Sequence, residues 1–118
     1  MSISAIVSGI AAARSALLVH ALTADRARLF EATDDRLHQR QRAAAMPDTI
    51  ALIDALRAQG HAAVVSGAGP SVLVLADGAG DAGAPVGALT PPGWTALALD
   101  VDAIGAEVLV GAPEVSSR

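Results

Sequence analysis

A glycine-containing loop between two short apolar runs is the feature that most constrains this chain. The sequence VVSGAGPSVLVL covers Val64 to Leu75, and the loop Ser66–Ser71 separates the two runs. Each run is short and rich in Val and Leu, which is typical of a buried strand. A tight hairpin needs only two turn residues. The longer loop therefore predicts either a wide structural hairpin or a nest of backbone N–H groups that binds a phosphate or a carboxylate.

The composition excludes several classes of site. The 118 residues contain no cysteine, which excludes thiolate catalysis, disulfides and zinc–sulfur sites. All 8 basic residues are arginines, so the lysine of a Walker-type phosphate loop is absent. A net charge of −4, with one Trp and one Phe, argues against nucleic-acid binding. We expect no metal site, no membrane span and no signal peptide, and therefore a cytoplasmic protein.

Hydrophobic periodicity predicts helices over Ile3–Thr23, Asp25–Thr33 and Pro47–Gln59. The second helix should be capped by its first residue, and the third should begin at a proline and end before a glycine in the left-handed conformation. A weaker helical pattern covers Ala82–Leu89. The residues expected to be buried in the second helix are Leu29 and Phe30.

The first predicted helix carries most of its large apolar residues on one face. These residues are Ile3, Ile6, Val7, Ile10, Leu17, Leu18 and Leu22. Arg14 falls in the middle of this stripe, where an unpaired charge is costly. Two interpretations stay open, namely an arginine whose stem is buried while its head reaches water, and an arginine held at a site for an anion.

Four strands are expected, and they follow the helices in the chain. The first two, His61–Val65 and Ser71–Ala76, flank the glycine loop. The other two, Thr95–Leu99 and Glu107–Val110, are separated by a turn over Asp102–Gly105. Helices followed by strands indicate an α+β fold rather than a doubly wound parallel sheet.

Several stretches resemble the GHMP small-molecule kinases. SGAGPSVLVL resembles the third motif of that family, and ATDDRLHQRQRAAAMP resembles the block A-T-x-D-x-L-H-Q-P-Y-R-x-x-x-M-P of its homoserine kinases. ARSALLVHAL and GWTALALDVDAIGAEV resemble the preceding helix and the C-terminal strands of the same enzymes. The resemblance runs in order over nearly all of residues 11–110.

The resemblance implies that residues 1–118 are the C-terminal domain of a homoserine kinase, which transfers the γ-phosphoryl group of ATP to the hydroxyl of L-homoserine in threonine biosynthesis. It also implies a ferredoxin-like antiparallel sheet packed by helices. ATP, Mg²⁺ and L-homoserine belong to the complete enzyme, whose N-terminal domain carries a P-x-x-x-G-L-G-S-S-A loop that has no counterpart in this sequence. The chain alone is expected to be inactive.

The same resemblance implies roles for individual residues. The residues expected beside the phosphates are Ser66, Gly67, Ala68, Gly69, Pro70 and Ser71. Arg42 matches the arginine that helps to hold the amino-acid substrate, and Arg36 and His38 belong to the same block. The sequence departs from the family at Arg40-Gln41, where Pro-Tyr is usual, which places a second guanidinium near Arg42. No catalytic acid–base residue and no metal ligand can be named.

The family's sheet has a central first strand that precedes the first helix, so the resemblance implies an unfilled position between the glycine-loop hairpin and the C-terminal strands. An unfilled position exposes backbone groups and invites pairing with another chain, including a second copy. The alternative function is therefore a non-catalytic ferredoxin-like binding or dimerisation module derived from a GHMP kinase. Another GHMP kinase is disfavoured by the block DRLHQ…R…MP.

Overall fold

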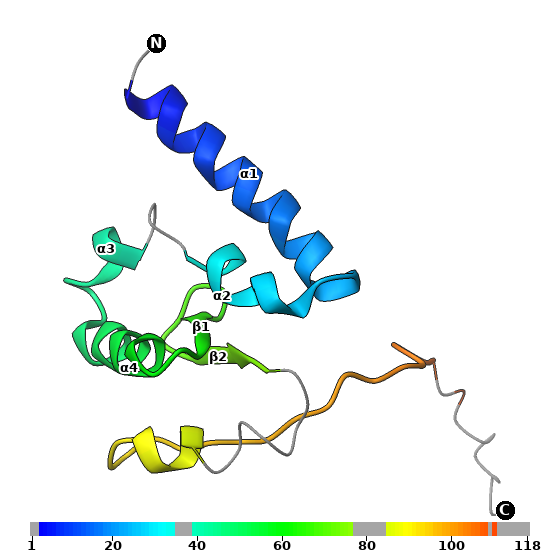
Figure 1. Ribbon diagram of the computed structural model, residues 1–118. Helices are drawn as coiled ribbons and strands as arrows, with labels where there is room; N and C mark the ends of the chain where they lie inside the picture. Colours follow the sequence, from blue (N-terminus) through cyan, green and yellow to red (C-terminus); the bar gives the residue numbers. More distant parts are fainter. Residues whose placement is uncertain (1–2, 35–38, 77–84, 109, 111–118) are drawn as a thin grey trace, which may run out of the picture.

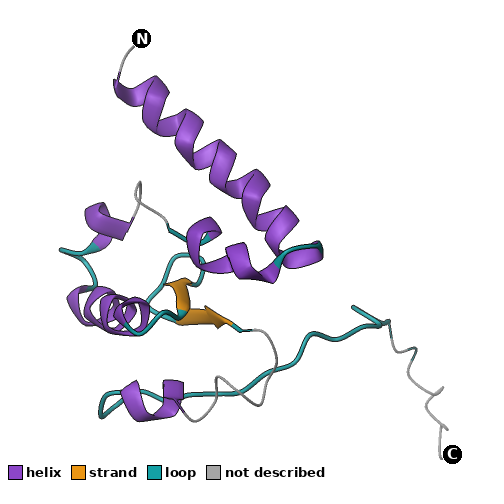
Figure 2. Cartoon of the chain, viewed as in Figure 1, coloured by secondary structure: helices purple, strands orange, loops and turns teal. Residues whose placement is uncertain are grey.

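The computed structural model describes residues 3–34, 39–76, 85–108 and 110. It contains helices and one antiparallel sheet of two strands (Figure 1), which confirms the α+β class. A helical turn at residues 85–89 and a long extended segment follow the sheet (Figure 2). The labelled elements are α1 (Ile3–Thr23), the 3₁₀ turn η1 (Arg26–Arg28), α2 (Leu29–Ala32), α3 (Gln39–Arg42), α4 (Pro47–Ala58), β1 (Ala62–Val65) and β2 (Val72–Leu75).

The hairpin of β1 and β2 lies at the centre of the packing. Ala62 pairs with Leu75 and Ala63 pairs with Val74 across the two strands. Because successive side chains of a strand point to opposite faces, the first pair faces α1 and α2, and the second pair faces α4. Helices thus pack against both faces of the hairpin, which explains why both runs are apolar at every position.

The helix α4 forms as its sequence predicts. Pro47 occupies the first turn, where its missing N–H costs no hydrogen bond, and Gly60 follows the helix with φ of +86°. Ile53 is 1% exposed and Leu56 is 2% exposed, and both pack against the hairpin. The helix is one residue shorter than predicted, because Gln59 is already its C-terminal cap.

The bounds predicted for α1 are confirmed, but its apolar face is covered only in part. Leu17 and Leu18 pack against the cluster around the fully buried Ala21. In contrast, Ile10 is 46% exposed and Leu22 is 50% exposed. For Ile10 the reason is visible in Figure 1, where the N-terminal half of α1 projects beyond the other described elements, whereas Leu22 lies at the opposite end of the helix and lines a cavity.

The second predicted helix differs in two respects. It starts as the 3₁₀ turn η1, and Asp25 makes no side-chain capping bond because its carboxylate lies 3.3 Å from Arg28 Nε. Leu29 is buried as predicted, but Phe30 is 42% exposed, so the expectation of burial was wrong for that ring. The guanidinium carbon of Arg57 lies 4.2 Å from the Phe30 ring centroid, so a cation, not the apolar core, covers one face of the ring.

Arg14 is paired with groups near the end of α2 and has a structural role. Its Nη1 donates to the backbone oxygen of Glu31 at 2.7 Å and lies 3.2 Å from Asp34 Oδ2. These bonds connect α1 to the chain at the end of α2. The charge in the apolar stripe is thereby compensated by an anionic partner and a carbonyl, which is the condition that such a position requires.

Arg57 connects α4 to both of its neighbours. Its guanidinium donates to the backbone oxygen of Phe30 at 2.8 Å, to Thr33 Oγ1 at 3.1 Å and to the backbone oxygen of Ala63 at 3.2 Å. These acceptors lie on α2, in the turn that follows it and in β1. Burial lowers the pKa of the Arg57 guanidinium, and the nearby carboxylate of Asp34 acts in the opposite direction.

Replacing Arg57 by methionine should therefore destabilise the chain substantially. Arg57→Met keeps the apolar stem but leaves the acceptors of Phe30, Thr33 and Ala63 without their donor, which should cost about 2–3 kcal/mol of unfolding free energy. Urea denaturation measures this change.

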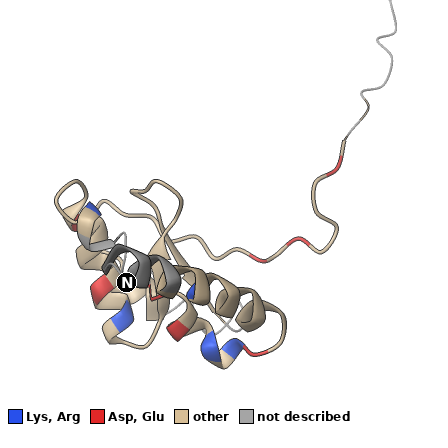
Figure 3. Ribbon diagram, turned by 90° about the horizontal axis from the view of Figure 1, so that it is seen from above, with Lys and Arg blue, Asp and Glu red and all other residues tan. Residues whose placement is uncertain are grey.

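A matched control for that experiment is Arg28→Met. Arg28 makes only exposed ion pairs, with Asp25 and with Glu31 Oε2 at 3.5 Å. Basic and acidic residues both occur on the helical part of the chain in Figure 3. The control should change the unfolding free energy by about 0.5 kcal/mol or less. Equal effects of the two substitutions would contradict a special role for Arg57.

The two C-terminal strands were predicted wrongly. Neither Thr95–Leu99 nor the described part of Glu107–Val110 is paired in a sheet. The segment is extended and open to water, with Leu97 at 74% exposure and Val108 at 92%. The turn between the predicted strands is confirmed, since the Ile104 N–H donates to an oxygen of the Asp102 carboxylate at 2.9 Å. The alternating pattern is present, but a strand needs a neighbour to satisfy its backbone, and none of the described residues supplies one.

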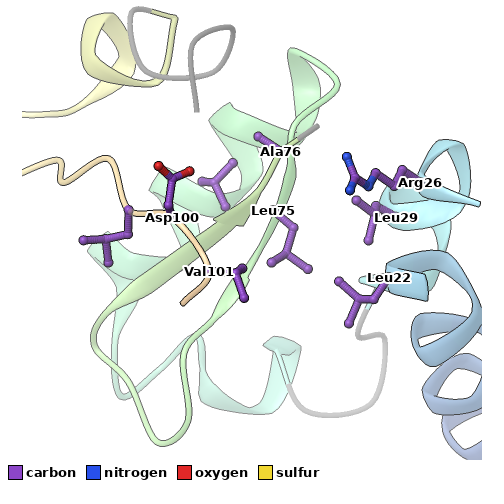
Figure 4. Close-up of a pocket in the computed structure, with 9 residues that line it drawn as sticks. Leu22, Arg26, Leu29, Leu75, Ala76, Asp100 and Val101 are labelled. Atoms are coloured by element: carbon purple, nitrogen blue, oxygen red, sulfur yellow. The ribbon is translucent and has the colours of Figure 1, made fainter. Parts of the chain in front are cut away.

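A cavity of about 340 Å³ separates β2 from this extended segment (Figure 4). Leu75 and Val101 come from its two backbone walls, and Leu22 and Leu29 reach it from the helices. Arg26 and Asp100 are the charged residues of the lining. The cavity therefore lies between the hairpin and the C-terminal segment, where the resemblance implies an unfilled strand position.

Hydrogen exchange should show a free edge on β2. Alternate amides of a strand in a two-stranded sheet point away from its partner. In the monomeric chain, every second amide of Val72–Leu75 should exchange as fast as an unpaired amide, while the others are protected. Protection of all of these amides at a concentration where the chain is monomeric would show that the second edge is paired.

Candidate functional site

The glycine loop is held by its own backbone at two points. The Ser66 N–H donates to the Ser71 oxygen at 2.8 Å, and the Gly69 N–H donates to the Ser66 oxygen at 3.0 Å. Gly67 has φ of +58° and Gly69 has φ of +82°, values that other residues adopt rarely. In the part of the chain that the structure describes, the amides of Gly67 and Ala68 have no acceptor. Two adjacent donors are thus left for a ligand, as the nest interpretation requires.

The side of the loop at Gly69 is closely packed. A Cβ placed on Gly69 would lie 2.9 Å from both Sδ and Cε of Met46, and 3.2 Å from Cγ1 of Val65. A Cβ placed on Gly67 would meet nothing within 4 Å. Gly69 therefore allows the loop to approach Met46 and Val65 closely, whereas the loop surface at Gly67 is open.

Arg42 reaches the loop from α3. Its Nη1 donates to the backbone oxygen of Gly67 at 2.9 Å, although 25 residues separate the two in the sequence. The structure thus brings Arg42, which belongs to the block ATDDRLHQRQRAAAMP, into contact with the loop Ser66–Ser71, which belongs to a second motif. Arg36 and His38 lie outside the described residues, as does the side chain of Arg40.

Thr49 is a residue of this site that the sequence analysis did not single out. It lies in the first turn of α4, is 2% exposed, and donates from Oγ1 to the Pro70 oxygen at 3.0 Å. A signal was present, because Thr49 shares a helix face with Ile53 and Leu56. A hydroxyl in an otherwise apolar stripe needs a partner and so marks a specific contact. Met46, whose side chain lies beside Gly69, gave no such signal.

Neither a metal site nor a membrane span is found among the described residues. Within the described ranges, His, Asp and Glu side chains form no group of three or more that could bind a metal ion. The same ranges contain no helix with the length and apolar character needed to cross a bilayer. The free amides at Gly67 and Ala68 suit phosphate oxygens.

An α+β domain with a glycine loop between two paired strands, and an arginine on a carbonyl of that loop, fits the class of C-terminal domains of small-molecule kinases. Comparison with known families supports the same class. Residues 13–88 match the family described as "GHMP kinases C terminal", and the chain belongs to this family.

Three similar curated proteins are each named homoserine kinase. The chain is 54% identical over 98 residues to a homoserine kinase of Streptomyces avermitilis, covering 83% of this chain and 32% of that protein. It is 51% identical to a homoserine kinase of Streptomyces coelicolor over 83% of this chain and 31% of the relative. It is 52% identical to one of Clavibacter michiganensis over 82% of this chain and 32% of the relative. The chain thus spans about a third of the length of the curated relatives it matches.

Alanine substitutions at the two loop glycines should have different effects. Gly67→Ala has to adopt a positive φ, which should cost about 1–2 kcal/mol. Gly69→Ala has the same backbone cost and in addition crowds Val65 Cγ1 at 3.2 Å and moves the flexible end of Met46, so its loss should be larger by about 0.5 kcal/mol.

Thermal or urea unfolding of both variants measures this difference, and each variant serves as the control for the other. Equal losses would show that the Met46 side chain moves aside without cost. A smaller loss for Gly69→Ala than for Gly67→Ala would contradict the close packing at Gly69.

Proposed function

We propose that the chain forms the acceptor side of a homoserine kinase, which transfers the γ-phosphoryl group of ATP to the hydroxyl of L-homoserine. In this reaction the hydroxyl oxygen forms a bond to the γ-phosphorus, the bond from that phosphorus to the β–γ bridging oxygen breaks, and the hydroxyl proton is released. The relatives named homoserine kinase support the proposal, since they are 51–54% identical over most of this chain.

The observation that carries the proposal is the contact between Arg42 and Gly67. A kinase must hold its acceptor beside the transferring phosphoryl group, since phosphoryl transfer depends mainly on positioning and charge stabilisation. One hydrogen bond of 2.9 Å links the arginine implied in acceptor binding to the loop implied beside the phosphates. The two parts of such a site therefore lie within one side-chain length of each other.

The chain's own groups suit two tasks in this reaction. Arg42 donates from Nη1 to the backbone oxygen of Gly67, and no described residue accepts a hydrogen bond from its Nε or Nη2. The edge of the guanidinium formed by Nε and Nη2 is therefore available for the carboxylate of an amino acid. The adjacent amides of Gly67 and Ala68 are available for phosphoryl oxygens. This chain matches about a third of the length of its relatives. ATP and Mg²⁺ would be held by the remaining part of such an enzyme.

A coupled kinase assay with ATP, Mg²⁺ and L-homoserine tests the proposal. We expect no turnover from this chain alone, and turnover when it is mixed with a separately expressed N-terminal region of the Streptomyces avermitilis homoserine kinase, its 54% identical relative. Turnover by the chain alone would contradict the assignment of ATP binding to the other region. A folded chain without activity in either assay would favour the alternative of a binding or dimerisation module.

In the active mixture, Arg42→Ala should lower kcat/KM for L-homoserine about 10- to 100-fold, because a charged hydrogen bond to the carboxylate is lost. Steady-state kinetics at varied L-homoserine measures the effect, with Arg28→Ala as the control at an exposed arginine. An unchanged KM and kcat in Arg42→Ala would exclude the acceptor-binding role.

A further inference from the structure

Among the described residues, two long-range side-chain hydrogen bonds hold the glycine loop, one near each of its ends. Arg42 donates to the oxygen of Gly67 near the start of the loop, at 2.9 Å. Thr49 donates to the oxygen of Pro70 near its end, at 3.0 Å. The loop's own bonds join the Ser66 N–H to the Ser71 oxygen and the Gly69 N–H to the Ser66 oxygen, and none of them uses these two carbonyls.

The two donors differ in their surroundings. Thr49 is 2% exposed and sits in the first turn of α4, whose Leu52, Ile53 and Leu56 are buried against the hairpin. Arg42 is partly exposed on the short helix α3 and has guanidinium edges left for a ligand. One end of the loop is thus fixed to the core, and the other is fixed to a residue that can also bind a ligand.

We propose that Thr49 is a positioning residue of the kinase site, which fixes the Pro70 end of the glycine loop so that the amides of Gly67 and Ala68 stay directed at the phosphoryl group. The Met46 side chain beneath Gly69 supports the same conformation by contact. This inference rests on the proposed function for its catalytic consequence, whereas its structural part concerns the loop alone.

Thr49→Val removes the hydroxyl while keeping the shape of the side chain, and Thr49→Ser keeps the hydroxyl. The chain offers a matched control in Thr33, the other buried threonine among the described residues, with 4% exposure. Its hydroxyl bonds to the Leu29 oxygen at 2.8 Å and accepts from Arg57, so it is a structural residue without contact to the loop. Thr33→Val therefore reports what the loss of a buried hydroxyl does to stability alone.

The first measurement is amide hydrogen exchange of this chain, followed by NMR. The amides of Ser66 and Gly69 report on the loop, and those of Ile53 and Leu56 in α4 report on the domain. In Thr49→Val we expect the loop amides to exchange about tenfold faster relative to the α4 amides, because the Pro70 carbonyl has lost its buried donor. Thr49→Ser should restore the wild-type ratio, and Thr33→Val should leave the ratio unchanged.

The second measurement is the kinase assay of the mixture described above. Thr49→Val should lower kcat about tenfold and change KM for L-homoserine less than about twofold, since Arg42 still holds the carboxylate. Thr33→Val should keep kcat per folded molecule. A ratio of loop to α4 exchange that stays constant in Thr49→Val would overturn the inference, as would a loss confined to KM.

The two measurements separate the inference from the proposed function. A loop that loosens in Thr49→Val, in a chain whose mixture shows no kinase activity, supports the positioning contact and contradicts the homoserine kinase assignment. An active mixture in which Thr49→Val has the kinetic constants of the unmodified chain supports the kinase and contradicts the role of Thr49.

Discussion

The packing of this domain depends on the position of one guanidinium. Arg57 stands where α4 ends, and its bonds reach α2, the turn after α2 and β1. The acceptors are backbone oxygens and a threonine hydroxyl, partly buried except for the exposed Phe30 oxygen, and the ring of Phe30 covers one side of the cation. The helices on the two sides of the hairpin belong to separate apolar clusters. The Arg57 guanidinium, with its several hydrogen bonds, therefore links two apolar clusters that each contain only a few buried residues.

The conformation of the glycine loop depends on the packing of the helices against the hairpin. The hairpin is fixed because helices cover both of its faces, and α4 is fixed because its buried residues pack on Ala63 and its neighbours. The first turn of α4 then places a hydroxyl at one end of the loop, while the chain just before α4 places Arg42 at the other. The loop is rich in glycine because it combines positive φ angles with a close approach to Met46, and a Cβ would oppose both at Gly69.

Much of this fold could be predicted from local sequence patterns. Apolar periodicity located α1, Pro47 and Gly60 located the ends of α4, and two Val- and Leu-rich runs located the hairpin. The capping bond expected of Asp25 is replaced by a local ion pair with Arg28, whereas the failures at Phe30 and at the C-terminal strands concerned partners distant in sequence. The pattern of Thr95–Leu99 is that of a strand, but the neighbour that would pair with it is not among the described residues.

The same cause limited what the sequence could say about the site. Phe30 is covered by a guanidinium rather than by apolar residues, and the hydroxyl of Thr49 finds its acceptor 21 residues away. The resemblance indicated Arg42 and the loop as parts of one site, but only the folded chain shows which atoms meet. Arg36 and His38 lie outside the described residues, so their roles stay predictions.

The extended C-terminal segment has a consequence for how the isolated chain behaves at high concentration. Leu97, Leu99 and Val101 are 74%, 79% and 96% exposed, and such alternating apolar segments readily stack into intermolecular β-structure. Asp100 and Asp102 interrupt the run with like charges that would be brought into register in any parallel stack. Aggregation is thus opposed by electrostatic repulsion, which added salt weakens. At low ionic strength, the two carboxylates rather than the packing of the fold therefore oppose association of this segment with other copies.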